Sequence, residues 1–386
     1  MIIGIPKEIL KGEKRVSATP QTVKKMINDG HQVLVEKGAG INSFYLDNDY
    51  IDSGAIIVDE VEALYKQAEV VLKVKEPQYN SNVGKCEIEM MRSDAILITF
   101  LHPANHSNHV MVNKLLDKGV TSFTLDGVPR ISRAQSMDAL SSMSTCAGYK
   151  GMMIAANNIA KFMPMIGSAV GMIRPSNVLV VGCGVAGLRA IATAKGLGAQ
   201  VYACDIREEA VEQAKSLGAR IIDLNIPKEI AVSKDGKHAN SLPKDYLELE
   251  RQQIKEAVKN ADIIILSALV FGKEAQVLVT KEMVESMKPG SYIVDISIDQ
   301  GGNCELTESG NVIEVNGIKI DGTKNIPGMI PTSSTYMFSE NTYNFLKYLV
   351  KDNKLNIDLT DEIISSTLVT HQGKLYHEGT IEAMSV

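Results

Sequence analysis

The sequence predicts an α/β protein with two doubly wound parallel sheets, and three observations carry this prediction. The chain has 386 residues, which favours two domains over one. Short apolar runs alternate with helical segments in both halves, which is typical of parallel strands joined by crossover helices. Near the middle, an apolar run leads into three closely spaced glycines and then a helix of small residues.

The first half repeats a strand–helix rhythm. Gly30 and Gly119 each follow a helical segment, where glycine favours the helix C-terminal cap. We therefore expect strands at 2–5, 31–36, 69–73, 95–100 and 121–125, and helices at 20–29, 59–67 and 110–117.

The second half begins after a segment at 139–162 that is rich in Ala, Met and Ser and predicts a long helix joining two domains. Further strands are expected from Val178 and at 220–224, 263–267 and 292–295. A Pro- and Ser-rich stretch after Asn325 precedes a helix at 340–350 and a hairpin at 367–377. We expect this tail to return to the first domain, so that residues 1–138 with 326–386 form a discontinuous domain and residues 139–325 the other.

The three glycines have the spacing G-x-G-x-x-G, between a strand and a helix. Gly182 permits a tight turn, Gly184 lets a diphosphate approach the backbone, and Gly187 lets the helix pack closely on the strand. The amides of Val185 and Ala186 lie at the helix start, where they would meet phosphate oxygens. The sequence thus predicts a dinucleotide site and a Rossmann-like fold for both domains, which long helices join.

An acidic residue, Asp205, stands 23 positions after the first glycine, at the end of the next apolar run. Its carboxylate would accept a hydrogen bond from a ribose 2′-hydroxyl and repel a 2′-phosphate, which favours NAD over NADP. Arg207 is close enough to weaken that preference, because a cation would attract the same phosphate.

Composition narrows the class of protein. Hydrophobic residues make up 45% and charged residues 22%, as in ordinary globular proteins. A formal charge of −6 argues against nucleic acid as a partner. No apolar run is long enough to span a membrane, and the N-terminus does not resemble a signal peptide. The five cysteines are scattered without metal or disulfide spacing, so we expect a reduced, cytoplasmic protein without a metal.

Four ionisable residues follow expected strands: Arg15, Lys75, His102 and Asp299. Ligands of open parallel sheets bind beyond the carboxyl ends of the strands. There, the two cations would hold the carboxylate of a 2-oxo acid, and the imidazole would exchange a proton near neutral pH. His106 and His109 could join His102 in a metal site, but they lack the acidic or Cys ligands that would support one.

Two polar segments have open interpretations. The loop at 129–142 is either a capped helix start or a contact for a nicotinamide amide. The segment at 228–245 is either a solvated loop or a mobile flap over a cofactor, and the sequence favours neither interpretation.

With these residues in view, the chain resembles, along nearly all its length, the soluble NAD(H)-binding alpha part of proton-translocating nicotinamide nucleotide transhydrogenase. The resemblance rests on runs at 129–143, 147–150, 267–273, 301–305, 326–332 and 368–374. It implies hydride transfer between NADH and NADP held by a partner subunit, with membrane subunits coupling the reaction to protons. It also implies a dimer or larger oligomer, attached to the inner membrane only through partners, as where the alpha subunit is split. The family's Arg–Gln–Asp loop, which positions the nicotinamide, maps onto Arg130, Gln135 and Asp138, and Leu269 is a further candidate cofactor contact.

The sister family, alanine dehydrogenase, offers a second interpretation. Transhydrogenases usually lack the matching residues Lys75, His102 and Asp299, whereas alanine dehydrogenases carry them with the arginine as their keto-acid site. By resemblance, His102 would be the proton donor and acceptor, Arg15 and Lys75 would hold the substrate, and Asp299 would serve the catalytic centre. The transhydrogenase flap motif is replaced by other residues at 236–239. A self-sufficient NAD-dependent amino-acid dehydrogenase acting on alanine or a relative therefore remains the alternative, with the amino acid, the proton coupling and the oligomeric state open.

Overall fold

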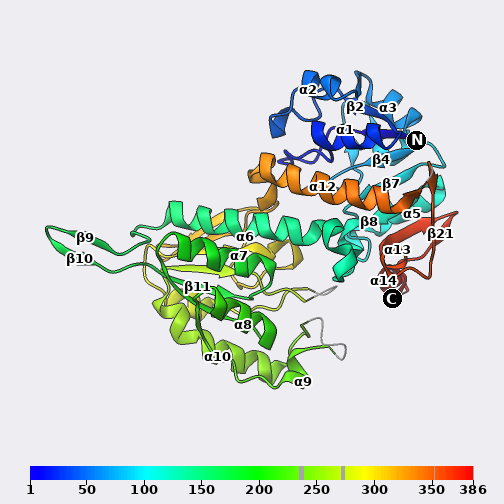
Figure 1. Ribbon diagram of the computed structural model, residues 1–386. Coiled ribbons are helices and arrows are strands. Elements are labelled where there is room, and N and C mark those ends of the chain that lie inside the picture. The colour runs from blue at the N-terminus through cyan, green and yellow to red at the C-terminus, as the bar shows by residue number, and fades with distance from the viewer. Residues whose placement is uncertain (234–238, 271–273, 352, 386) are drawn as a thin grey trace. The chain divides into compact units, whose positions relative to one another are not determined.

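The computed structural model describes residues 1–233, 239–270, 274–351 and 353–385. These residues form two compact units, one of residues 1–143 with 327–386 and the other of residues 144–326 (Figure 1). Over the described ranges, no helix is both long and apolar enough to cross a membrane.

The first unit is built on an eight-stranded sheet with the order β21-β20-β8-β7-β4-β1-β2-β3. Its sheet strands are β1 Ile2–Ile5, β2 Gln32–Glu36, β3 Ile56–Val58, β4 Val70–Leu72, β7 Ile96–Thr99, β8 Thr121–Thr124, β20 Leu368–His371 and β21 Lys374–Leu375. Its helices are α1 Pro20–Asn28, α2 Asp47–Asp52, α3 Val61–Gln67, α4 Glu87–Met90, α5 His109–Lys118, α12 Pro331–Leu349, α13 Glu362–Thr367 and α14 Glu378–Met384, with a small ribbon of β5 Tyr79–Asn80 and β6 Lys85–Cys86.

The six neighbouring strands from β3 to β8 in this sheet order are all parallel, and the C-terminal strand β20 adds to β8 in the antiparallel direction. The strand order reverses between β1 and β4, so the crossovers from these two strands leave in opposite directions. Ligands of doubly wound sheets bind at such a switch point, beyond the carboxyl ends of the strands. The segments that follow β1, β4 and β7 contain Arg15, Lys75 and His102.

The second unit has a seven-stranded sheet with the order β13-β12-β11-β14-β15-β17-β16, parallel except for the last pair. Its sheet strands are β11 Asn177–Val181, β12 Gln200–Cys204, β13 Arg220–Ile221, β14 Ile263–Leu266, β15 Tyr292–Asp295, β16 Val312–Val315 and β17 Ile318–Asp321. Its helices are α7 Val185–Gly196, α8 Glu208–Ser216, α9 Lys228–Ala231, α10 Lys244–Asn260 and α11 Lys281–Glu285, while α6 Ala139–Asn158 crosses from one unit into the other.

Alternate residues of these buried strands supply two separate cores. Val178 and Val180 face the core formed with α6, α7 and α8, whereas Leu179 and Val181 face the core formed with α10 and α11. Both sheet faces are therefore covered, which explains why the strands are continuous apolar runs. The predicted fold class of doubly wound parallel sheets is confirmed.

Among the expected helices, α12 differs most from its expected bounds, because it begins at Pro331, nine residues before the expected start. Proline at the first helical position has no backbone N–H to lose, so it begins this helix instead of breaking it. The hydroxyl of Ser334 donates to the carbonyl of Ile330, which satisfies a polar group that the sequence pattern associates with loops.

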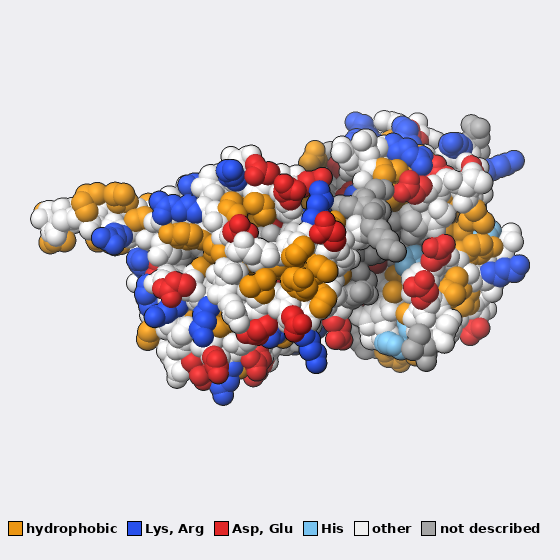
Figure 2. Space-filling view, turned by 90° about the horizontal axis from the view of Figure 1, so that it is seen from below, with side chains coloured by type: hydrophobic (Ala, Val, Ile, Leu, Met, Phe, Trp, Pro, Cys, Tyr) orange, Lys and Arg blue, Asp and Glu red, His pale blue; other side chains and the backbone are white. Residues whose placement is uncertain are grey.

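A two-stranded hairpin, β9 Ile166–Ser168 and β10 Gly171–Ile173, lies outside both sheets. In Figure 1 it projects from the second unit, and Figure 2 shows hydrophobic side chains along it. Met165, Val170 and Met172 are 59%, 92% and 68% exposed. A thin arm with this much exposed apolar surface is typical of a contact with another chain.

Candidate functional site

The glycine-rich turn connects β11 to α7 at the switch point between β11 and β14. Gly182 has a φ of +88°, a conformation that favours glycine, and a Cβ there would lie 2.6 Å from the amide nitrogen of Ala268. A Cβ on Gly187 would lie 1.9 Å from the carbonyl oxygen of Gly182. These two glycines are therefore required by the packing of the protein itself.

Gly184 differs from both of them. Its φ of −71° is open to any residue, and the nearest atom to an added Cβ is Nη2 of Arg207, at 3.8 Å. It is the N-cap of α7 and makes no side-chain cap hydrogen bond, so the first amides of Val185, Ala186 and Gly187 have no side-chain acceptor among the residues that the structure describes. Open space over a glycine, next to uncapped amides at a helix start, fits a diphosphate group.

Asp205 follows β12 and lies beside this turn. Its side chain is 5% exposed and accepts hydrogen bonds from the backbone amides of Cys183 (2.7 Å) and Arg207 (2.8 Å). The Arg207 guanidinium adds two more, from Nε at 3.1 Å and Nη2 at 3.0 Å. A carboxylate has about four acceptor positions, so a ribose hydroxyl would have to replace one of these bonds. The Arg207 side chain, 24% exposed, is the donor best able to move.

Arg207→Ala is expected to increase the discrimination against NADP. The change frees Asp205 for a ribose hydroxyl and removes the cation that would attract a 2′-phosphate, so the affinity for NADPH should fall about 10-fold relative to that for NADH. Calorimetric titration with both nucleotides measures this ratio. Arg189→Ala, which removes an exposed arginine from α7, is the matched control, and an equal change in both variants would contradict the role of Arg207.

A second carboxyl group, on Glu250 of α10, lies near Asp205 and was not predicted from the sequence. Glu250 is 5% exposed; burial, and then the Asp205 carboxylate, raise its pKa from 4.5 to about 7. A glutamate in a mainly polar helix gives no sequence signal for such burial.

Glu250→Gln is expected to stabilise the protein at pH 8 but not at pH 5. The folded-state pKa lies above the unfolded one, so ionising Glu250 costs stability progressively as the pH rises from about 4.5 to above 7. Removing the charge should therefore raise the free energy of unfolding at pH 8 by up to about 3 kcal/mol. Urea unfolding at both pH values measures the difference. Glu248→Gln, on the same helix but 58% exposed, should show no such pH-dependent gain.

The polar loop before α6 belongs to the first unit. Asp138 accepts from the amide (2.8 Å) and hydroxyl (2.6 Å) of Ser141, so it caps the start of α6, as the simpler interpretation of this loop predicts. Arg130 and Gln135 are exposed. The loop is held from behind, where the Asn341 side chain donates to the carbonyl of Ser136 at 2.9 Å.

His102 follows β7 and lies against Asp126, which follows β8. Its Nδ1 is 3.3 Å from Asp126 Oδ2, and its ring is stacked on Phe100. Burial lowers the pKa of His102, but the Asp126 carboxylate outweighs it, so the pKa lies above the usual value. His102 also has a φ of +43°, which is uncommon for a residue other than glycine and recurs at functional sites. The ring is 45% exposed, so this pair can exchange a proton with a ligand.

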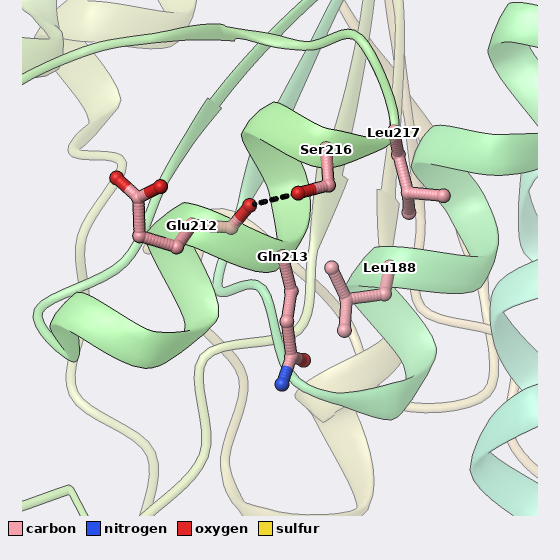
Figure 3. Close-up of a pocket in the computed structure, with 5 residues that line it drawn as sticks. All are labelled: Leu188, Glu212, Gln213, Ser216 and Leu217. Atoms are coloured by element: carbon pink, nitrogen blue, oxygen red, sulfur yellow. Dashed lines mark hydrogen bonds between the residues drawn. The ribbon is translucent and has the colours of Figure 1, made fainter.

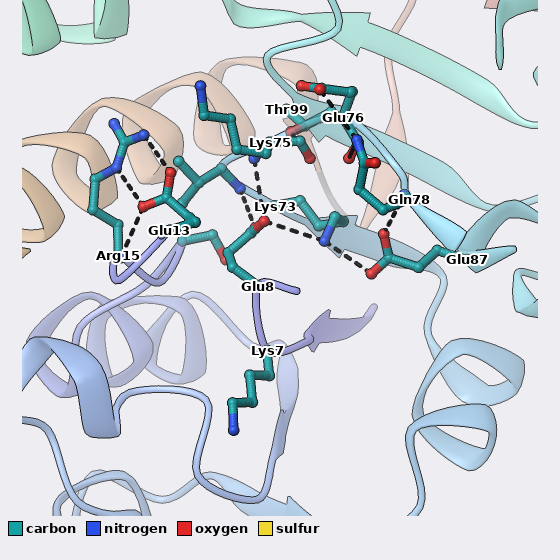
Figure 4. Close-up of polar contacts among 12 residues, drawn as sticks. Lys7, Glu8, Glu13, Arg15, Lys73, Lys75, Glu76, Gln78, Glu87 and Thr99 are labelled. Atoms are coloured by element: carbon teal, nitrogen blue, oxygen red, sulfur yellow. Dashed lines mark hydrogen bonds and ion pairs between the residues drawn. The ribbon is translucent and has the colours of Figure 1, made fainter. Parts of the chain in front are cut away.

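Arg15 and Lys75 lie in the same unit, but their charged groups differ in their contacts (Figure 4). Arg15 is 3% exposed and forms a double ion pair with buried Glu13, at 2.8 and 2.6 Å. Lys75 is half-buried and has no ion pair or hydrogen bond on its ammonium group from the residues that the structure describes. Its charge is close enough to oppose the rise in the pKa of His102. Lys75 is therefore better placed than Arg15 to accept a carboxylate from solution.

Asp299 lies in the second unit, in the 3-10 turn Ile296–Gln300, and it is exposed. The neighbouring acid that organises this turn is Asp295, which is fully buried and accepts from the amides of Asn303 (2.8 Å) and Cys304 (3.0 Å). Burial raises the pKa of Asp295, and these donors oppose the rise. The sequence did not distinguish the buried acid from the exposed one.

Leu269 lies on the loop after β14 and is 40% exposed. Its neighbour Ala268 is held through both backbone groups by the buried side chain of Asn303, at 2.9 Å each. Residues 271–273 of the same segment, and residues 234–238 of the predicted flap, lie outside the described residues.

Besides Glu250, the sequence pattern does not identify Asp126 and Glu13, which contact the candidate residues His102 and Arg15. Asp126 follows a strand of the same parallel set as His102, so the strand-end criterion would have found it. Glu13 precedes Arg15 by two residues, and nothing in the sequence shows that they pair.

One surface hollow of about 420 Å³ lies between α7 and α8, lined by Leu188, Glu212, Gln213, Ser216 and Leu217 (Figure 3). None of the predicted site residues lines it. Among the residues that the structure describes, no group of three or more His, Cys, Asp or Glu side chains could hold a metal ion.

Comparison with known families matches both halves of the chain. Residues 4–147 match the alanine dehydrogenase/PNT N-terminal domain, and residues 151–378 match the alanine dehydrogenase/PNT C-terminal domain.

Individual relatives come from both branches of that family. The chain is 39% identical to an NAD(P) transhydrogenase subunit alpha chain of Rhodospirillum rubrum, over 98% of each chain. It is 32% identical to alanine dehydrogenase of Methanococcus maripaludis, over 99% of this chain and 96% of the relative. Among solved structures, a transhydrogenase from Sinorhizobium meliloti has a TM-score of 0.83 at 36% identity, covering 98% of this chain and 99% of the other. An L-alanine dehydrogenase has a TM-score of 0.82 at 28% identity, covering 100% and 99%.

Proposed function

The chain belongs to the alanine dehydrogenase/PNT family, and on that premise we propose that it is an NAD(H)-binding oxidoreductase, the alpha subunit of a transhydrogenase that transfers hydride from NADH to NADP. The observation that carries this proposal is the open glycine turn at Gly184, with uncapped helix amides and Asp205 beside it. In this site the amides of Val185 and Ala186 would hold the diphosphate, and Asp205 the adenosine ribose. The nicotinamide, when bound, would supply the hydride.

The transhydrogenase function is supported over the dehydrogenase function by two observations. Relatives named as transhydrogenase alpha subunits are more similar in sequence than the alanine dehydrogenases, at 36–39% against 32–33% identity. Arg130 and Gln135 are exposed on a loop that is anchored from behind, as a contact with a partner subunit requires. The partners would be an NADP-binding subunit and membrane subunits, which would hold this chain at the inner membrane surface.

The test is a reconstitution assay. The purified chain is mixed with the NADP-binding subunit of a related transhydrogenase, NADH and an NADP analogue whose reduction is visible. Hydride transfer that requires both proteins is the expected result. Amino-acid-dependent formation of NADH by the chain alone, without transfer in the mixture, would contradict the transhydrogenase function.

A second candidate function is favoured by a specific observation. The Lys75 ammonium has no ion pair or hydrogen bond with the described residues, and it lies in the same unit as the His102–Asp126 pair. These groups suit an NAD-dependent dehydrogenase of alanine or a related amino acid. The substrate would give a hydride to NAD and a proton to His102, water would add, and ammonia would leave a 2-oxo acid. Turnover with an L-amino acid, or with pyruvate and ammonia in reverse, tests this function.

We also propose that the chain is a homodimer or larger homo-oligomer, because the apolar hairpin β9–β10 is left exposed within one chain. Light scattering of the purified chain should give at least twice the monomer mass. The double variant Val170→Asp, Met172→Asp should reduce the measured mass to that of the monomer.

A further inference from the structure

A cluster of buried charged side chains holds the start of the segment that follows β4 (Figure 4). Its centre is Lys73, whose side chain is fully buried and whose Nζ is 2.9 Å from Glu87 Oε1 and 3.3 Å from Glu8 Oε2. The hydroxyl of buried Tyr65 donates to the same Glu87 oxygen at 2.6 Å. The functions proposed above assign no role to these four residues.

The two carboxylates of this cluster also bind backbone amides. Glu8 accepts from the amide of Val74 at 2.6 Å and, more weakly, from that of Lys75 at 3.4 Å. Glu87 accepts from the amide of Gln78 at 2.7 Å. Residues 73–78 have no helix or strand structure, so side-chain carboxylates replace the partners that a regular element would give to these amides.

The cluster thus determines the path of the backbone that carries Lys75. The carbonyl of Lys75 accepts from the Thr99 hydroxyl at 2.9 Å, so the residue is held on both sides of its Cα. Its ammonium group makes no ion pair or hydrogen bond with any described residue. The charge of Lys75 acts on Glu13 and His102 only at a distance, by lowering their pKa values. A residue whose backbone is held and whose ammonium group has no direct partner among the described residues is arranged to meet a ligand.

We propose that Lys73, Glu8 and Glu87 are positioning residues that hold Lys75 in place to bind the carboxylate of a small 2-oxo or amino acid. The proposal rests on the second candidate function, since it concerns the same acid-binding site. Lys73 is the residue on which the cluster depends, because its ammonium group pairs with both buried carboxylates, which would otherwise repel each other. Burial already raises the pKa of Glu8 to about 7, even with Lys73 beside it.

The test uses the full chain and two measurements that respond to different causes. Hydrogen exchange of the peptide covering 73–78 reports how firmly the segment is held. Calorimetric titration of pyruvate into the NADH-loaded chain, without ammonia, reports acid binding without turnover. Lys73→Met and Glu8→Gln are compared with Lys75→Met, and Lys85→Met, which breaks an exposed ion pair with Glu62, is the control. Glu8→Gln keeps an oxygen for the amide of Val74, so it should fold even if Lys73→Met does not.

In both cluster variants we expect exchange of the segment to become at least 10-fold faster and pyruvate affinity to fall about 10-fold, with NADH affinity unchanged. In Lys75→Met, pyruvate affinity should fall by a similar factor while exchange stays as in the wild type. If Lys73→Met or Glu8→Gln folds and the hydrogen exchange of residues 73–78 stays as in the wild type, the positioning role is overturned, whatever the affinity for pyruvate. If Lys75→Met binds pyruvate as tightly as the wild type, the acid site itself is wrong, and the positioning proposal fails with it.

Discussion

The Gly184→Ala variant is expected to fold with wild-type stability and yet bind NADH at least about 100-fold more weakly. Alanine accepts the φ of −71° at this position, and the nearest atom to the new methyl group is 3.8 Å away. The methyl group would, however, occupy the space through which a diphosphate reaches the amides at the start of α7. Calorimetric titration with NADH and thermal unfolding of the same sample measure the two effects.

Two other glycines of the same region serve as controls. Gly196→Ala, at the end of α7, adds a carbon with nothing within 4 Å of it. This variant should not lower NADH affinity or stability. Gly187→Ala should lose both, because its Cβ would lie 1.9 Å from a backbone oxygen. Unchanged NADH affinity in Gly184→Ala would remove the glycine turn as the diphosphate site, and with it both proposed functions.

His102→Gln is expected to lower any amino-acid dehydrogenase activity by a factor of about 10² to 10⁴, the usual contribution of a general acid or base. NADH affinity should stay as in the wild type, because the change lies in the first unit and the glycine turn belongs to the second. His106→Gln, an exposed histidine nearby in sequence, should keep full activity. Equal losses in the two variants would show that His102 acts through the structure and not through proton transfer.

Asp126→Asn changes the pKa of His102 while keeping the imidazole itself. Without the carboxylate, the effect of burial prevails, so the pKa of His102 falls. The imidazole then becomes neutral at a lower pH. The limb of the kcat/KM profile that reports this group should therefore shift to lower pH, both for amino-acid oxidation and for the reverse reaction. A profile that superimposes on the wild type would show that the His102–Asp126 contact does not affect catalysis.

Local patterns in the sequence predicted the features that neighbouring residues determine. The strand, glycine turn and helix around Gly182 follow from an apolar run, residues that permit tight backbone contacts, and small side chains, all within a short window. The capped helix start, one of the two interpretations that the sequence left open for the loop before α6, is local in the same way, since Asp138 and its partner Ser141 are three residues apart. The sequence predicts too late a start for α12 because proline and serine are common in loops, although both also occur at helix starts.

Pairings between charged residues could not be predicted in this manner. Only the folded chain shows that Arg15 is paired with buried Glu13, and that Asp295, not Asp299, is the buried acid. The cluster of Lys73, Glu8 and Glu87 joins residues up to 79 positions apart that meet only when β1 and β4 pair in the sheet.

The sequence by itself therefore determined the class of fold, the glycine-rich turn and the strand ends at which the candidate site residues lie, because hydrophobic period and glycine spacing act within one element. Only the tertiary structure decided which charges are neutralised and which remain available. The electrostatic energy of a side chain depends on its distance to other charges and on its burial, and both are set by strands that are adjacent in space but far apart in the chain.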